Sequence, residues 1–121
     1  MSGKKTLVLG ASSNPTQYSH LAVVRLTAAG HEAVAIGREP FSIGTVNVID
    51  SPEPFSDIDT VTLYLNTNRQ TAYEDYMLSL HPRRIIFNPG AENPAFMKKA
   101  AEQGIVCMEA CTLVMLSTGV F

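Results

Sequence analysis

The chain has 121 residues, 45% of them hydrophobic, which suits one domain with a single buried core. Its formal net charge of −2 and scattered lysines and arginines argue against nucleic acid as the main partner, because such binding needs a clustered basic face. No apolar run approaches the roughly 18 residues that span a bilayer, and no signal-peptide segment precedes the first predicted strand. We therefore expect a cytoplasmic protein without membrane contact.

The first half of the chain alternates strand and helix patterns. Residues 7–9 form a short apolar run followed by glycine, which predicts a buried strand. Apolar residues then recur at helical spacing over residues 19–29, with Gly30 placed to end the helix. Residues 32–36 restore a strand pattern, and residues 45–49 predict another short strand before a proline-containing loop.

The second half repeats this alternation. We expect strands over residues 60–65, 84–87 and 105–108, and helices over residues 71–80, 94–104 and 112–117. Strands that alternate with helices predict a parallel sheet covered on both faces, with right-handed crossovers. The sequence therefore predicts a single α/β domain over residues 1–121, with a doubly wound, Rossmann-like parallel sheet of about five strands.

Ligands of such sheets bind outside the carboxyl ends of the strands, at the point where strand order reverses. The candidate site is therefore formed by the turns that follow Leu9, Ile36, Leu65 and Phe87. These turns differ in how clearly they indicate a ligand.

The turn after the first strand is the clearest candidate. Gly10, Ala11, Ser12 and Ser13 offer consecutive backbone amides and two hydroxyls ahead of a helix, an arrangement that holds nucleotide phosphates. Their spacing is not the dinucleotide fingerprint G-x-G-x-x-G. Pro15 indicates a longer loop, with Thr16 or Ser19 as the N-cap of the helix.

Cations and amides follow the other strands. Arg38 directly follows the second strand, where an arginine accommodates the ribose phosphate found in NADP and coenzyme A; the alternative is a solvated arginine paired with Glu39. Asn66, Asn68 and Arg69 follow the strand at residues 60–65 and either contact the ligand or cap the next helix.

The turn at residues 88–90 is similarly open. Its Gly90 either redirects the chain or offers backbone to the far end of a ligand.

The remaining reactive residues favour structural roles. We expect His20 to be structural or on the surface, and His31 and His81 to be on the surface. Cys107 and Cys111 read as free thiols that pack as small hydrophobic residues. No His, Cys or Asp cluster indicates a metal, and no residue is assigned a catalytic role.

A set of short motifs in a fixed order resembles a known family. The set comprises residues 8–12, Tyr18-Ser19, residues 29–31, Ile43-Gly44, residues 57–59, Pro89-Gly90 and residues 108–111. Over nearly the whole chain it resembles the small stand-alone CoA-binding domain proteins of bacteria. These look like the CoA-binding Rossmann domain of succinyl-CoA synthetase without its partner domains, and no reaction is established for them as a class.

The resemblance implies a site by position. The turn from Gly10 to Ser13, with Ser19, would hold the phosphates of CoA, Gly37 and Arg38 would border the adenosine end, and Leu65 and Asn66 would complete the cleft.

Three positions depart from the family pattern. Gln17 stands where members often have a lysine, Gly37-Arg38 where they commonly have Asn-Pro, and Ala110 where they usually have an arginine. We hypothesise that Arg38 supplies the charge lost at Gln17.

The sequence thus predicts non-catalytic binding of coenzyme A or an acyl-CoA, a small nucleotide ligand. The alternatives are an NADP-dependent oxidoreductase that uses Arg38, and an interaction domain that has lost its ligand. A homodimer, or a separately encoded acyl-transferring enzyme, is a possible protein partner.

Overall fold

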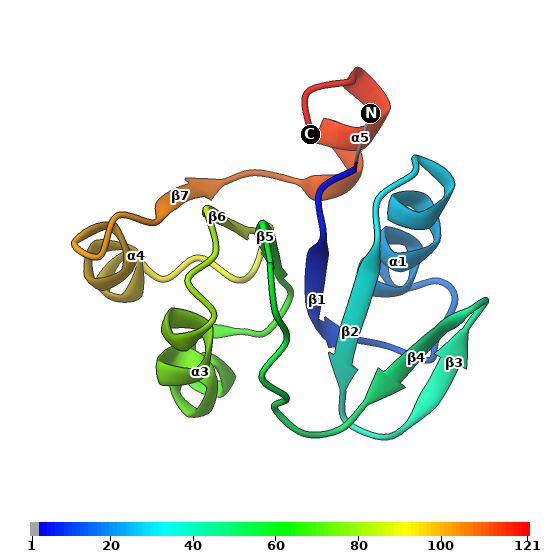
Figure 1. Cartoon of the computed structure of the whole chain (residues 1–121), viewed down its shortest axis with the longest axis horizontal. Helices are drawn as coiled ribbons and strands as arrows, with labels where there is room; N and C mark the ends of the chain where they lie inside the picture. The colour runs from blue at the N-terminus through cyan, green and yellow to red at the C-terminus, as the bar shows by residue number, and fades with distance from the viewer. Residues whose placement is uncertain (1–2) are drawn as a thin grey trace.

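The computed structural model describes residues 3–121, which form one seven-stranded sheet with helices on both faces (Figure 1). The strands are β1 (Thr6–Ala11), β2 (Ala33–Gly37), β3 (Phe41–Ile43), β4 (Val46–Ile49), β5 (Thr60–Leu63), β6 (Arg84–Phe87) and β7 (Val106–Glu109). The helices are α1 (Tyr18–Ala28), α2 (Thr67–Gln70), the 3-10 helix η1 (Thr71–Tyr73), α3 (Glu74–Ser79), α4 (Pro94–Ala101) and α5 (Thr112–Thr118). The predicted single-domain α/β fold is confirmed.

The strand order is β3-β4-β2-β1-β5-β6-β7. Strands β2, β4 and β3 lie on one side of β1 in the sheet. The later strands β5, β6 and β7 lie on the other side of β1, in chain order. The strand order therefore reverses between β1 and β5, and this is the topological switch point.

The edge strand β3 was not predicted, so the sheet exceeds the expected five or so strands. Residues Phe41–Ile43 pair antiparallel with β4 around a turn in which Gly44 has a φ of +58°. A strand of three residues has too little periodicity to be recognised alone, and it is the pairing with β4 that defines it.

The helix predicted over residues 71–80 begins earlier and is divided into α2, η1 and α3. It begins earlier because the Asn66 side chain accepts a hydrogen bond from the Arg69 amide at 3.0 Å and so caps the first turn.

Alternate residues of the central strands pack against opposite helical layers. Leu7 and Leu9 of β1 contact the layer of α3 and α4, whose buried members include Met77 and Phe96. Val8 faces the layer of α1 and α5. The two layers lie on opposite sides of the central strands (Figure 1), so β1 and β5 are buried on both faces.

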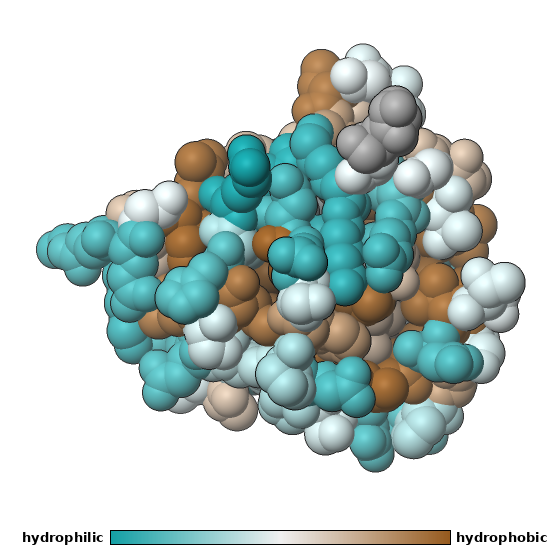
Figure 2. Space-filling model, viewed as in Figure 1, coloured by the Kyte–Doolittle hydropathy of each residue, from teal (hydrophilic) through white to brown (hydrophobic). Residues whose placement is uncertain are grey.

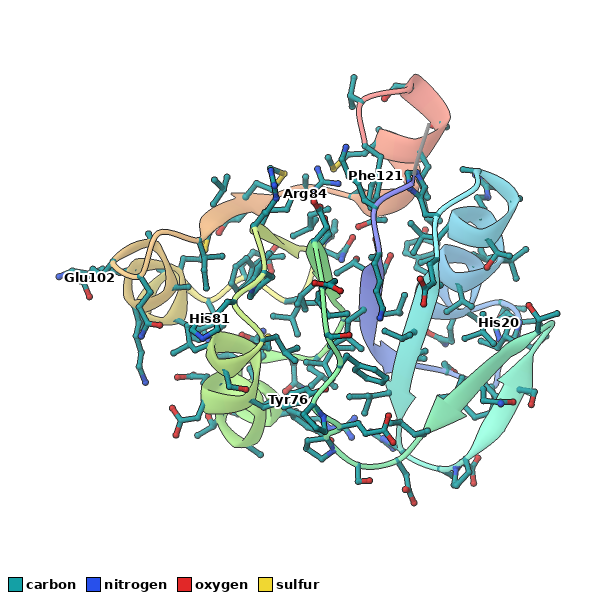
Figure 3. All side chains as sticks on the ribbon, viewed as in Figure 1. His20, Tyr76, His81, Arg84, Glu102 and Phe121 are labelled. Carbon is teal, nitrogen blue, oxygen red and sulfur yellow. The ribbon has the colours of Figure 1, made fainter. Side chains whose placement is uncertain are left out.

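Phe121 packs against residues at the end of the sheet where β1, β2 and β6 begin. The Lys4 ammonium and Arg84 Nη2 donate to the Phe121 carbonyl oxygen, the latter at 3.1 Å, and the Arg84 guanidinium lies 4.3 Å from the centre of the Phe121 ring (Figure 3). His31 packs on the same ring at 4.9 Å, and its Nδ1 accepts from the Lys4 amide at 2.8 Å. His31 is therefore a half-buried structural residue rather than the predicted surface one, whereas His81 is exposed.

Hydrophilic side chains cover much of the face shown in Figure 2, with apolar areas visible between them. Within residues 3–121 no helix is long and apolar enough to cross a membrane. The cellular compartment stays a prediction.

Candidate functional site

A cleft of about 1000 Å³ lies at the carboxyl ends of β1, β2, β4 and β5. Its walls are the turn after β1, the residues that follow β2 and β4, and the segment between β5 and α3. The cleft thus spans the switch point, where doubly wound folds bind their ligands. Eight of the eleven residues predicted for the site line it: Gly10, Ala11, Ser12, Ser13, Ser19, Gly37, Arg38 and Leu65.

The floor of the cleft contains a bulge at Gly10, since the pairing of β1 with β2 shifts register between Leu9 and Ala11. Gly10 has a φ of +102°, a conformation that glycine adopts without steric cost. A Cβ at Gly10 would lie 3.1 Å from Leu65 Cδ2 and 3.2 Å from the Tyr64 carbonyl carbon. Gly10 therefore lets the turn pass directly against the backbone that follows β5.

The turn after β1 is fixed by its own side chains. The Ser12 hydroxyl accepts from the Asn14 amide at 3.1 Å, and Asn14 Oδ1 accepts from the amide and the hydroxyl of Thr16 at 3.0 and 2.8 Å. His20 Nδ1 lies 2.8 Å from the Ser12 carbonyl oxygen, to which it donates as the protonated ring nitrogen. His20 therefore holds the turn from the first turn of α1.

The helix α1 begins at Tyr18 with Gln17 as its N-cap, and Gln17 provides no side-chain cap. The predicted caps are wrong: Thr16 is bonded to Asn14, and Ser19 is a buried residue inside the helix. No side chain among the described residues accepts from the first amides of α1. These amides, at the positive end of the helix dipole, are therefore left without side-chain acceptors, and Gln17, Tyr18 and Ser19 line the cleft there.

Strand β2 ends against β1 at Gly37. A Cβ at Gly37 would lie 2.6 Å from the Ala11 carbonyl oxygen, so no side chain fits. Arg38 and Glu39 follow at the rim, where both are exposed and line the cleft. The ion pairs within residues 3–121 do not include one between them, so the Arg38 guanidinium is available to an anion.

The opposite wall follows β5 and includes Tyr64, Leu65, Arg69 and Tyr73. Three residues predicted for the site lie outside the lining of the cleft. Asn66 caps α2, Asn68 is exposed on that helix, and the Gly90 amide donates to Glu92 Oε1 at 2.9 Å.

A buried glutamine fixes this wall. Gln70 is fully buried, and its Nε2 donates to the carbonyl oxygens of Leu65 and Ala91 at 2.8 and 2.7 Å. Its Oε1 accepts from Asn93 Nδ2 at 2.9 Å. One side chain thus joins the loops that follow β5 and β6. The sequence offers no sign of this role, because a glutamine within a helical segment reads as a surface residue.

Asn88 also has a structural role, because its side chain joins β5 to the start of α5. Its Nδ2 donates to Thr62 Oγ1 at 2.8 Å and to the Leu63 carbonyl at 3.0 Å, and its Oδ1 accepts from the first amide of α5, that of Thr112, at 2.8 Å. The hydroxyls of Thr62 and Thr112 are 2.7 Å apart.

Nearby, the Tyr64 hydroxyl is buried without a partner among the described residues, and burial raises the pKa of Tyr64 to about 12.

Several lining residues were not predicted as site residues from the sequence: Asn14, Thr16, Tyr18, Asp50, Tyr64 and Tyr73. Asp50 directly follows β4, and placement after a sheet strand is the signal by which it was detectable.

Other chemistry lies away from the cleft. Residues 3–121 contain no group of three or more His, Cys, Asp or Glu side chains placed to hold a metal. Cys107 and Cys111 are free thiols that do not line the cleft, and burial raises the pKa of Cys107.

The comparison with known families shows to which family this domain belongs. A family model described as CoA binding domain matches residues 4–117. The chain belongs to the CoA-binding domain family. The predicted resemblance is thereby confirmed.

Solved structures share the fold of this chain. One, described as an uncharacterized protein, is 42% identical with a TM-score of 0.96, and the match covers 100% of both chains. A Thermus thermophilus protein, cell-free ID.343, shares the fold at 21% identity and a TM-score of 0.81, covering 98% of this chain and 91% of that one.

A conserved hypothetical protein from Pyrococcus furiosus shares the fold at 20% identity and a TM-score of 0.77, covering 93% of this chain and 97% of that one. None of the curated proteins matches this CoA-binding domain closely.

Proposed function

We propose that this chain binds coenzyme A or an acyl-CoA in the cleft at the switch point and catalyses no reaction itself. The observation that carries the proposal is the uncapped start of α1 behind the Gly10 bulge, on a chain of the CoA-binding domain family. Backbone amides at such a turn bind a pyrophosphate.

The cations of the cleft support a ligand with several phosphates. Gln17 and Arg38 line the same cleft, in agreement with the hypothesis that Arg38 provides the charge that Gln17 lacks. A charge-assisted hydrogen bond from a guanidinium to a phosphate is about twice as strong as a neutral one.

The non-catalytic part of the proposal follows from the side chains in the cleft. Nucleophilic catalysis requires a nucleophile within hydrogen-bond reach of a base that a third group orients. Among the described residues, no His or Cys lines the cleft, and no lining hydroxyl is hydrogen-bonded to Glu39 or Asp50, the carboxylates of the cleft.

Thermal-shift measurements with CoA, acetyl-CoA, dephospho-CoA, NADP and NAD test the binding. We expect the CoA compounds to raise the Tm, because a ligand that binds the folded state stabilises it by mass action. Stabilisation by NADP alone would reject the proposal and favour the oxidoreductase reading, which rests on Arg38 following β2. No response to any compound would favour an interaction domain without a ligand.

Arg38→Ala tests the assigned cation by calorimetric titration with CoA. We expect affinity to fall by about ten- to a hundredfold, from the roughly 1.5–3 kcal/mol of a hydrogen bond to a charged group. Arg25→Ala is the matched control, since Arg25 is an exposed arginine of α1 that does not line the cleft. Equal affinity in both variants would remove Arg38 from the site.

A further inference from the structure

The charged side chains of the cleft are divided unevenly between its two ends. Arg38 and Glu39 follow β2, and Asp50 follows β4, whereas Arg69 is the charged residue on the β5 wall. Within the lining described here, the β2–β4 end therefore has two carboxylates and one guanidinium, a net charge of −1.

The sheet brings these three charges together. Strands β2 and β4 are parallel neighbours, and Ile36 pairs with Ile49. Gly37 and Asp50, the next residues along each strand, therefore lie at the same level of the sheet. Asp50 consequently stands beside the segment that carries Arg38 and Glu39, and all three side chains are exposed.

The adenosine end of a nucleotide lies over this part of a doubly wound sheet, with the phosphates at the turn after the first strand. A carboxylate there accepts hydrogen bonds from ribose hydroxyls, whereas an arginine there accommodates a ribose phosphate. A phosphate monoester carries a charge of about −1.5 to −2, so two carboxylates oppose the attraction that one guanidinium provides.

We propose that the cleft does not select for the ribose phosphate of CoA, and that dephospho-CoA and its thioesters bind at least as tightly as CoA. This inference rests on the proposed function. Arg38 then serves the pyrophosphate at the Gly10 turn, while Glu39 and Asp50 suit an unphosphorylated ribose.

Calorimetric titration of the whole chain with CoA and dephospho-CoA tests the inference, because the two ligands differ by one phosphate. We expect the Kd for CoA to equal that for dephospho-CoA or to exceed it by up to about fivefold, the effect of an exposed charge pair. CoA binding tighter than dephospho-CoA, beyond the error of the two titrations, would overturn it.

Neutral variants provide the second arm. We expect Glu39→Gln combined with Asp50→Asn to shift the preference toward CoA by about three- to tenfold at low salt, because only the phosphorylated ligand gains from losing the repulsion. Glu102→Gln is the control: Glu102 is exposed after α4, outside the cleft lining, and we expect an unchanged preference (Figure 3).

The outcomes separate the two proposals. An unchanged preference in the double variant would overturn the inference while CoA binding itself stands. Failure of the wild-type chain to bind either ligand would overturn the proposed function and this inference with it.

Discussion

The close approach of Gly10 to the backbone after β5 makes Gly10→Ala a quantitative test of how the cleft floor is built. At a φ of +102°, an alanine costs about 1–3 kcal/mol of backbone strain. Its Cβ would also press on Leu65 and Tyr64 at 3.1–3.2 Å. Crowding of this kind costs about a further 1–3 kcal/mol, because both neighbours belong to packed structure.

Gly90→Ala is the matched control for the backbone term. Gly90 has a φ of +94°, and a Cβ there would meet no atom within 4 Å. Both variants also restrict the unfolded chain by the same amount, so this effect cancels in the comparison.

The free energy of unfolding from urea denaturation gives the difference between the two variants. We expect Gly10→Ala to be less stable than Gly90→Ala by about 1–3 kcal/mol, which lowers the urea midpoint by about 1 M at the usual slope. Equal stability of the two variants would refute the reasoning, since the approach of the turn to β5 would then not be tight.

Two further predictions concern other parts of the fold. Gln70→Leu should lower the free energy of unfolding, measured by urea denaturation, by about 2–4 kcal/mol, because the buried carbonyls of Leu65 and Ala91 lose their donor. Gln103→Leu, at an exposed glutamine, is the control. Similar stability of the two variants would contradict the role assigned to Gln70. Burial lowers the pKa of His31 below the ordinary value of 6.5, and the charges of Lys4 and Arg84 lower it further. The folded state therefore binds fewer protons than the unfolded chain near this pH, so the free energy of unfolding should fall as the pH drops below about 6.5. Unfolding measured across pH should show a shallower decline for His31→Gln, and identical slopes would count against this account.

The sequence predicted the parts of the fold that depend on local pattern. Residues Arg84–Phe87 form β6 as expected, since four residues with an apolar core run into Asn-Pro-Gly, a strong stop. The short β3 escaped prediction because it exists through its pairing with β4. The early start of the helical segment after β5 depends on the Asn66 cap, which was considered only as an alternative to ligand contact.

The candidate site was predictable to the extent that strand ends define it. Arg38 directly follows β2, and Gly10 lies at the bulge one residue before the end of β1 rather than in a turn after residue 9 as predicted; both line the cleft. Tyr73 lies at the end of η1, away from any strand end, yet it lines the cleft, and a rule based on strand ends could not find it. The turn at residues 88–90 was left open by the sequence, and its structural role depends on long-range contacts: the Asn88 side chain donates to Thr62 and Leu63 and accepts from the Thr112 amide.

The Gln70 bridge has a kinetic consequence for any ligand of the cleft. Because its hydrogen bonds tie the loops after β5 and β6 together within the protein itself, that wall has its final shape before a ligand arrives. Association then loses little backbone conformational entropy on this side, and we expect the ordering cost to fall mainly on exposed side chains that line the cleft, among them Tyr18, Arg38 and Arg69. We therefore expect encounter with the cleft to be limited by diffusion and orientation rather than by rearrangement of the β5–β6 wall.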